Sequence, residues 1–169
     1  MYRIVQGSVG GLTLLSLLLM PIQSSCAKSP APLSLKIIER SASSGIVKPT
    51  LQFMAISDEP RFLAFYKKLH AINIPAPAPP PIDFERHHVL IAFMGQRSSA
   101  GYAISFDETP IKPAQDIEIK VLMQVPPTGA ITAQVLTHPY VLATVARGAY
   151  RRVTFVDQDG KRLGQLKLE

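Results

Sequence analysis

The sequence predicts an α+β domain, built mainly as an antiparallel β sandwich or a strongly curved sheet with one amphipathic helix. Short apolar runs bounded by Gly, Pro, Asp and Ser recur along most of the chain, which is typical of strands joined by turns. A single segment, residues 59–70, instead spaces its apolar side chains as a helix does. No internal repeat is visible, and residues 28–169 suffice to bury one core without crosslinks.

The first 27 residues are typical of a secretory signal peptide. Arg3 supplies the positive charge, residues 12–20 form the apolar run, and small residues dominate 21–27. The apolar run is too short to be a convincing transmembrane span. We therefore expect an exported protein whose folded part is a single domain over residues 28–169.

Cys26 is the only cysteine, and it lies where a bacterial lipoprotein is cut and acylated. Ser24 and Ser25 precede it and Ala27 follows it, but Gln23 occupies a position that is usually aliphatic in lipoprotein signals. Ordinary cleavage after Ala27 is the alternative, and it leaves no anchor. We expect either a membrane-anchored lipoprotein or a periplasmic or secreted protein. In both cases the folded body has no thiol, which excludes disulfides and cysteine nucleophiles.

The first elements are two strands and a helix. Residues 33–39 and 51–56 read as strands, and the turn-forming run 40–45 between them predicts a hairpin. Ser57 and Asp58 both suit the N-cap of the helix over 59–70. Its aromatic stripe is the apolar face that a helix needs to pack on a sheet.

A proline-rich connector and further strands follow. Residues 73–81 hold five prolines in nine positions, which favours an extended strap between helix and sheet. Six later strands are expected, at residues 89–94, 101–106, 117–124, 131–137, 152–156 and 161–168. Asp159-Gly160 supplies the tight turn between the last two. We expect all strand pairing to be antiparallel.

The charge pattern indicates a solvated surface. The chain has 18 basic and 12 acidic residues, and the basic ones are scattered without a dense block. No nucleic-acid-binding module is recognisable, and export gives such binding no rationale. We expect no nucleic-acid partner.

Catalytic and metal-binding patterns are missing from the sequence. The adjacent His87 and His88 point to opposite faces of a strand, so they do not chelate one metal together. No common nucleophile, zinc, phosphate-binding or dinucleotide motif occurs. Ser98 or Ser99 paired with His138 would lack a third triad member. We predict a non-enzymatic protein without metal or cofactor.

The connection after residues 89–94 is the candidate binding site. Gly95 and Gly101 suit backbone positions with positive φ, and Arg97, Ser98 and Ser99 between them offer a cation and two hydroxyl groups. Such a loop on a rigid sheet is a common place for binding residues. The alternative is an ordinary polar connection that binds nothing.

Two tyrosines extend this candidate site. Tyr102 and Tyr140 each lie near a loop–strand junction, where a tyrosine commonly packs its ring inward and bonds its hydroxyl to neighbouring backbone. If their edges instead reach the rim near Arg97, Arg and Tyr together form a typical contact patch. The partner-binding residues predicted from the sequence are Arg97, Ser98, Ser99, Gly101, Tyr102, His138 and Tyr140.

Several short motifs, taken in order, resemble a known family. They are Ser44-Gly45, the aromatic helix, Ile82-Asp83-Phe84, the strand with Gly95-Gln96-Arg97 and Gly101-Tyr102, and Thr137-His138-Pro139-Tyr140. This order is similar to the C-terminal domain of the protease-complex subunit PrcB family, extracytoplasmic proteins often carried as lipoproteins. The likeness covers residues 33–147. Ser99-Ala100 stands where family members usually have Thr-Gly, and Phe62 and Phe65 stand where a tryptophan is common.

The resemblance implies a function for the domain. The implied partner is another extracytoplasmic protein, such as a protease. The domain would assemble with this partner or stabilise it. If Cys26 is acylated, its lipid would also attach the protein to a membrane. A second hypothesis is a chagasin-like protease inhibitor that presents residues 95–102. A third is a structural lipoprotein of the cell envelope.

Overall fold

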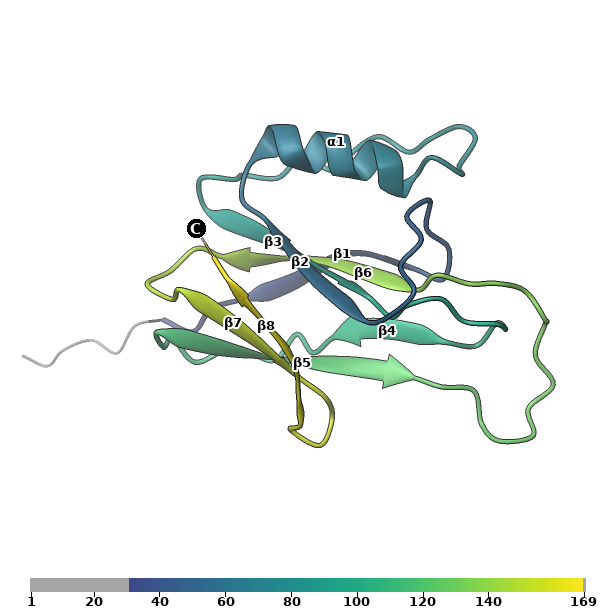
Figure 1. Cartoon of the computed structure of the whole chain (residues 1–169). Coiled ribbons are helices and arrows are strands. Elements are labelled where there is room, and N and C mark those ends of the chain that lie inside the picture. The colour runs from purple at the N-terminus through teal and green to yellow at the C-terminus, as the bar shows by residue number, and fades with distance from the viewer. Residues whose placement is uncertain (1–30, 169) are drawn as a thin grey trace, which may run out of the picture.

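The computed structural model describes residues 31–168 as two four-stranded sheets packed face to face, with one helix on the outer face of the first sheet (Figure 1). This arrangement confirms the predicted α+β sandwich. The signal segment and Cys26 lie outside the described residues. No helix within residues 31–168 is long and apolar enough to cross a membrane.

The nine elements are divided between the two sheets and the helix. In spatial order the first sheet consists of β1 (Leu35–Ser41), β6 (Tyr140–Ala146), β3 (His87–Phe93) and β2 (Gln52–Ile56). The second consists of β4 (Ala103–Phe106), β5 (Asp116–Gln124), β7 (Arg152–Val156) and β8 (Arg162–Lys167). The helix α1 spans Glu59–Leu69.

The first sheet is covered on both faces, which explains its apolar central strands. Along β3 and just beyond it, Leu90, Ala92 and Met94 face the core between the sheets, whereas Ile91 and Phe93 face α1. A strand buried on both faces reads as a continuous apolar run, and β3 and β6 both do. The apolar contacts on both faces agree with an inner position of β3 in the sheet.

Helix α1 forms where the sequence predicts it. The side chain of Asp58 accepts a hydrogen bond from the backbone N–H of Arg61 at 2.9 Å, as an N-cap residue does. Its apolar stripe is buried against the outer face of the first sheet and consists of Phe62, Phe65, Tyr66 and Leu69. The expected packing role of the aromatic residues is thereby confirmed.

The expected strand over residues 131–137 is wrong. This segment is an irregular part of the connection between β5 and β6, and its one ladder contact is an isolated bridge between Thr137 and Arg97. The strand lies later, at Tyr140–Ala146. Alternation was the wrong guide here because Ile131 and Val135 are exposed, whereas the buried strand does not alternate.

Two expected pairings are also wrong. β1 and β2 do not form a hairpin, because β6 and β3 lie between them in the sheet. β5 and β7 pair in parallel rather than antiparallel, with Asp116 opposite Arg152. The segment 147–151 crosses from β6 in the first sheet to β7 in the second. After this crossing, β7 runs in the same direction as β5. The predicted hairpin of β7 and β8 is confirmed.

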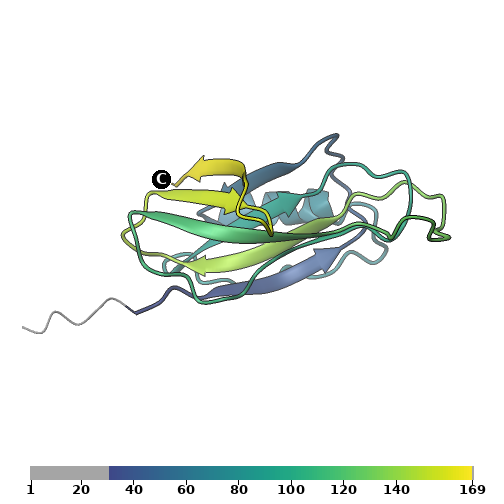
Figure 2. The same ribbon diagram turned by 90° about the horizontal axis from the view of Figure 1, so that it is seen from below.

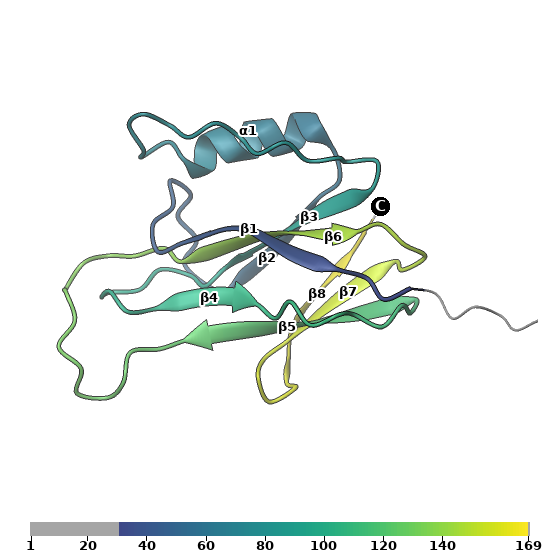
Figure 3. The same ribbon diagram turned by 180° about the vertical axis from the view of Figure 1, so that it is seen from behind.

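The strand directions give the sandwich two distinct ends (Figures 1 and 3). We call the connections 42–51, 94–102 and 125–139 together the loop end, because the strands that they join finish there. Residues 31–34, 107–115 and 147–151 lie at the opposite end, which we call the far end. Seen from below, the long 125–139 connection and the start of the described chain again lie at opposite ends (Figure 2).

Candidate functional site

The 94–102 connection is held firmly against the 125–139 connection. The backbone groups of Arg97 and Thr137 exchange two hydrogen bonds of 2.9 Å, and Ala100 N–H donates to the carbonyl of Ala133 at 2.9 Å. The Thr137 hydroxyl donates to the carbonyl of Ser99 at 3.1 Å. The candidate binding loop is therefore hydrogen-bonded along its length to a second connection, and it is not a free hairpin tip.

Both glycines of the loop adopt the conformations that the sequence predicts. Gly95 has a φ of 89° and Gly101 a φ of 93°, a region that favours glycine. A Cβ atom on Gly95 would lie 2.9 Å from the carbonyl carbon of Thr50, and one on Gly101 would lie 2.9 Å from Cγ of Pro126. Each glycine thus permits one connection to approach its neighbour at the loop end.

Arg97 is the charged residue of the 94–102 connection, and contacts within the fold orient its side chain. Its Nη2 donates to the carbonyl of Met94 at 2.9 Å, and its guanidinium carbon lies 5.4 Å from the centre of the Tyr102 ring. That distance is within the range of a cation–π interaction. Nε is buried without an acceptor, and none of the salt bridges found among residues 31–168 includes Arg97.

A hollow of about 500 Å³ opens beside this guanidinium group. Its lining residues come from all three connections and are Pro49, Gln96, Arg97, Ser98, Tyr102 and Leu136. Ser98 is exposed, and Tyr102 is half-buried with its ring packed against the core between the sheets. The lining combines a cation and polar groups with the apolar Pro49 and Leu136, which suits a ligand with both characters.

The structure brings together only part of the predicted site. Arg97, Ser98 and Tyr102 share the hollow, whereas Ser99 directs its hydroxyl to the neighbouring carbonyl of Ala100 at 3.3 Å. Gly101 supplies the turn, as described above. His138 is half-buried, and its backbone N–H donates to the carbonyl of Ala42 at 2.9 Å.

Tyr140 lies away from the hollow, on the helix side of the first sheet. Its side chain is buried and its hydroxyl donates to the carboxylate of Glu39, where the sequence predicts a backbone acceptor. The Tyr66 hydroxyl donates to the same carboxylate at 3.1 Å. Burial, then the Glu39 charge, raises the pKa of Tyr66 to about 12. These contacts give Tyr140 a structural role.

The contributions of Pro49, Gln96 and Leu136 to the hollow were missed from the sequence. Pro49 and Leu136 come from connections that are distant from Arg97 in the chain, and only the tertiary fold brings them together. No sequence signal identifies Pro49 or Leu136 as neighbours of Arg97. The loop-end connections contain no Asp or Glu, although they contain Lys48 and Arg97.

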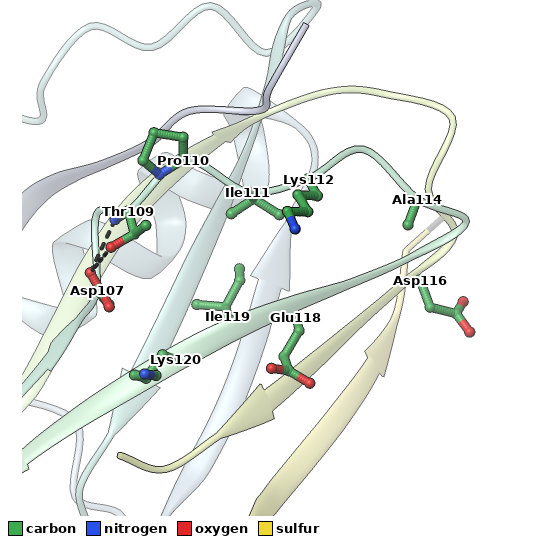
Figure 4. Close-up of a pocket in the computed structure, with 10 residues that line it drawn as sticks. All are labelled: Asp107, Thr109, Pro110, Ile111, Lys112, Ala114, Asp116, Glu118, Ile119 and Lys120. Atoms are coloured by element: carbon green, nitrogen blue, oxygen red, sulfur yellow. Dashed lines mark hydrogen bonds between the residues drawn. The ribbon is translucent and has the colours of Figure 1, made fainter. Parts of the chain in front are cut away.

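A second hollow, of about 440 Å³, lies at the far end beside the β4–β5 connection (Figure 4). Two of its charged groups, Asp107 and Asp116, already have partners. Arg152 donates to both oxygens of Asp116 at 2.8 and 2.7 Å, and Thr109 donates to Asp107 through its hydroxyl at 2.6 Å. These hydrogen bonds lower the pKa of both carboxyl groups. No cluster of potential metal ligands occurs in the described part of the chain.

Comparison with known proteins identifies a family for the middle of the chain. Residues 88–146 match the family model described as PrcB C-terminal. No curated protein and no solved structure matches the chain. The predicted resemblance is thus confirmed for a segment that runs from β3 to β6 and includes both the 94–102 and the 125–139 connections.

Proposed function

We propose that this chain is an exported, non-enzymatic interaction domain that assembles with or stabilises an extracytoplasmic protease complex. The family match over residues 88–146 carries this proposal, because the matched segment includes two of the three connections that line the hollow at Arg97. The hollow is small, partly polar and built on backbone hydrogen bonds, as befits a contact site on a rigid scaffold.

The start of the described chain is compatible with a lipid anchor at Cys26. The described chain starts at the far end, so a lipid on Cys26 would attach the protein on the side opposite to the loop end (Figure 3). The loop end would then point away from the membrane and remain open to a protein partner. The signal peptide and the lipid are part of this proposal.

Affinity purification from the native envelope tests the proposed function. A tagged chain should retain an extracytoplasmic protease, and the purified chain should raise the melting temperature of that protease, because a ligand that binds only the folded state stabilises it. If no protease is retained at low or moderate salt, the proposed partner class is wrong.

A chagasin-like inhibitor is the second candidate function. The observation that favours it is the presentation of residues 95–102 at one end of a β sandwich. An inhibitor should cause a dose-dependent loss of activity of a cysteine protease such as papain. An accessory subunit should leave that activity unchanged.

A further inference from the structure

The loop end carries an unusual set of exposed apolar side chains. Nine large apolar side chains are exposed within residues 31–168, and five of them lie in the loop-end connections, which make up about a quarter of these residues. The five are Val47, Val125, Ile131, Val135 and Leu136. Ile131 is fully exposed, at 103% of its reference area. Exposed apolar groups concentrated in the connections at one end of a domain indicate a contact surface, and Leu136 among them lines the hollow.

The three loop-end connections carry charge of one sign, whereas the β7–β8 turn, which contacts β5 through Gln158 and Met123, contains Asp157 and Asp159. Lys48 and Arg97 are the formal charges of the three connections, and neither Asp nor Glu occurs there. By contrast, the far end has Asp107, Glu108 and Asp116 in or next to one connection. The loop end therefore offers complementarity to a partner that is both acidic and apolar.

Arg97 marks the place on the loop end where an acidic group of the partner would bind. Its guanidinium group is oriented by the Met94 carbonyl and by the Tyr102 ring, and no carboxylate in residues 31–168 neutralises it. A planar guanidinium in a fixed orientation is well suited to a carboxylate, which accepts two N–H groups at once. Leu136, on the rim of the same hollow, adds an apolar contact beside it.

We infer that the loop end binds a protein segment in which an acidic side chain is flanked by apolar residues. The acidic side chain enters the hollow and pairs with Arg97, and its apolar neighbours cover Leu136 and Ile131. This inference rests on the proposed function and adds the chemistry of the partner.

A protein segment fits this surface better than an anionic membrane does. Clusters of about four to eight Lys or Arg residues mark lipid-binding segments, whereas the three connections together contain two. Five exposed apolar side chains and two cations in the same three connections instead match an interface with a few anchors and an apolar surround.

Selection from a random peptide library tests the inference. The peptides are displayed on phage through their C-termini, so that the selectable carboxylates are side chains, and the purified protein is the target. We expect enriched peptides to carry Asp or Glu next to Leu, Ile, Val or Phe. Replacing that acid by its amide in a synthetic, C-terminally amidated peptide should weaken binding at least tenfold.

Variants of the protein locate the contact. Arg97→Gln should weaken binding of the selected peptide at least tenfold, and Arg97→Glu should select basic peptides instead. Arg151→Gln, which changes an exposed arginine at the far end, is the matched control and should bind as the wild type does. Ile131→Ser and Leu136→Ser should weaken binding severalfold, whereas Leu63→Ser on the exposed side of α1 should not.

The outcomes separate this inference from the proposed function. Absence of acidic enrichment, or equal binding by the Arg97→Gln variant, overturns the inference even if a protease co-purifies. Selection of acidic peptides without a co-purifying protease supports the inference and contradicts the partner class. Binding to phosphatidylglycerol vesicles that is lost with Arg97→Gln, without peptide selection, assigns the site to lipid and overturns the inference. If the Arg97 variants fail to fold, the comparison of the acidic peptide with its amide analogue on the wild-type protein still tests the inference.

Discussion

The hydroxyl of Tyr140 on β6 donates a hydrogen bond to the carboxylate of Glu39, which lies on the neighbouring edge strand β1. Glu39 follows an irregularity in the pairing of β1 and β6 that begins at Ile37. The carboxylate also accepts from Tyr66 and lies 3.2 Å from Nε2 of His70. One acidic side chain thus joins the end of α1 to two strands of the first sheet.

Removal of the Tyr140 hydroxyl should therefore destabilise the fold. We expect Tyr140→Phe to lower the free energy of unfolding by about 1.5–3 kcal/mol, the range for a hydrogen bond to a charged group. Urea unfolding measures the change. Tyr102→Phe is the control, because its ring remains packed on the core and under Arg97. Equal stability of the Tyr140→Phe variant and the wild type would refute this role of Glu39.

His88 should make the protein sensitive to mild acid. It is buried, its Nδ1 lies 2.9 Å from Oγ of Ser57, and burial, followed by the charge of Arg147, lowers its pKa to about 4 from 6.5. The unfolded chain then binds a proton between these two pH values while the folded chain does not. Stability is fully present above pH 6.5 and is lost as the pH falls towards 4, by at most about 3 kcal/mol.

Unfolding in urea at a series of pH values from 7 to 4 measures this loss. His88→Gln should flatten the dependence between pH 6.5 and 4, whatever its effect at pH 7. The neighbouring, half-exposed His87 offers the matched control, and His87→Gln should keep the wild-type slope. If both variants keep the slope, the acid sensitivity arises from another group.

The fold class could be predicted from the sequence because most of its elements have strong local signals. The helix is fixed by the Asp58 cap and its apolar stripe, and the last hairpin by Asp159-Gly160. β6 was missed because the alternating segment 131–137 before it reads as the strand, although β6 is an apolar run like β3. Because β6 lies between β1 and β3, β1 cannot pair with β2. Local sequence patterns do not show which strands become neighbours in a sheet.

The candidate site was predictable only in its local part. Gly95, Arg97 and Gly101 were identified from the loop itself, and the structure gives both glycines positive φ. The roles of Pro49 and Leu136 depend on contacts between distant connections, which no local pattern encodes. Tyr140 was placed at the site because it lies at a loop–strand junction, as Tyr102 does, but the pleat of β6 turns its side chain towards α1.

Gly95 should be essential to the packing of the loop end. Gly95→Ala adds a Cβ that meets the Thr50 backbone at 2.9 Å, in addition to the strain of a positive φ. Gly129 has a similar φ of 83° with nothing within 4 Å of the added atom, so Gly129→Ala isolates the strain. We expect Gly129→Ala to cost about 1–2 kcal/mol and Gly95→Ala about 1–3 kcal/mol more. Equal losses in thermal or urea unfolding would mean that the close approach to Thr50 has no energetic weight.

Position 164 on β8 should tolerate only glycine, because the ring of Phe53 on β2 occupies the space that a larger side chain would need. The Phe53 ring stacks on Phe155, with ring centres 4.1 Å apart, and a Cβ atom on Gly164 would lie 2.8 Å from Cδ2 of Phe53. Gly164→Ala should therefore destabilise by about 1–3 kcal/mol through overpacking. The smaller side chain of Phe53→Leu should make room, so the double variant should be more stable than the sum of the two single losses predicts. Strict additivity would contradict a direct contact between these residues.

Cys26 should be the acylated first residue of the mature protein. It follows an apolar run among small residues, and no other cysteine exists in the chain. One acyl chain alone gives marginal membrane binding, so the two or three chains of a lipoprotein should retain the protein in the membrane fraction at high salt. Cys26→Ser should release it, while Ser25→Ala should not. Mass spectrometry of the mature N-terminus provides the direct measurement, and an unmodified chain that begins at Lys28 would show ordinary cleavage instead.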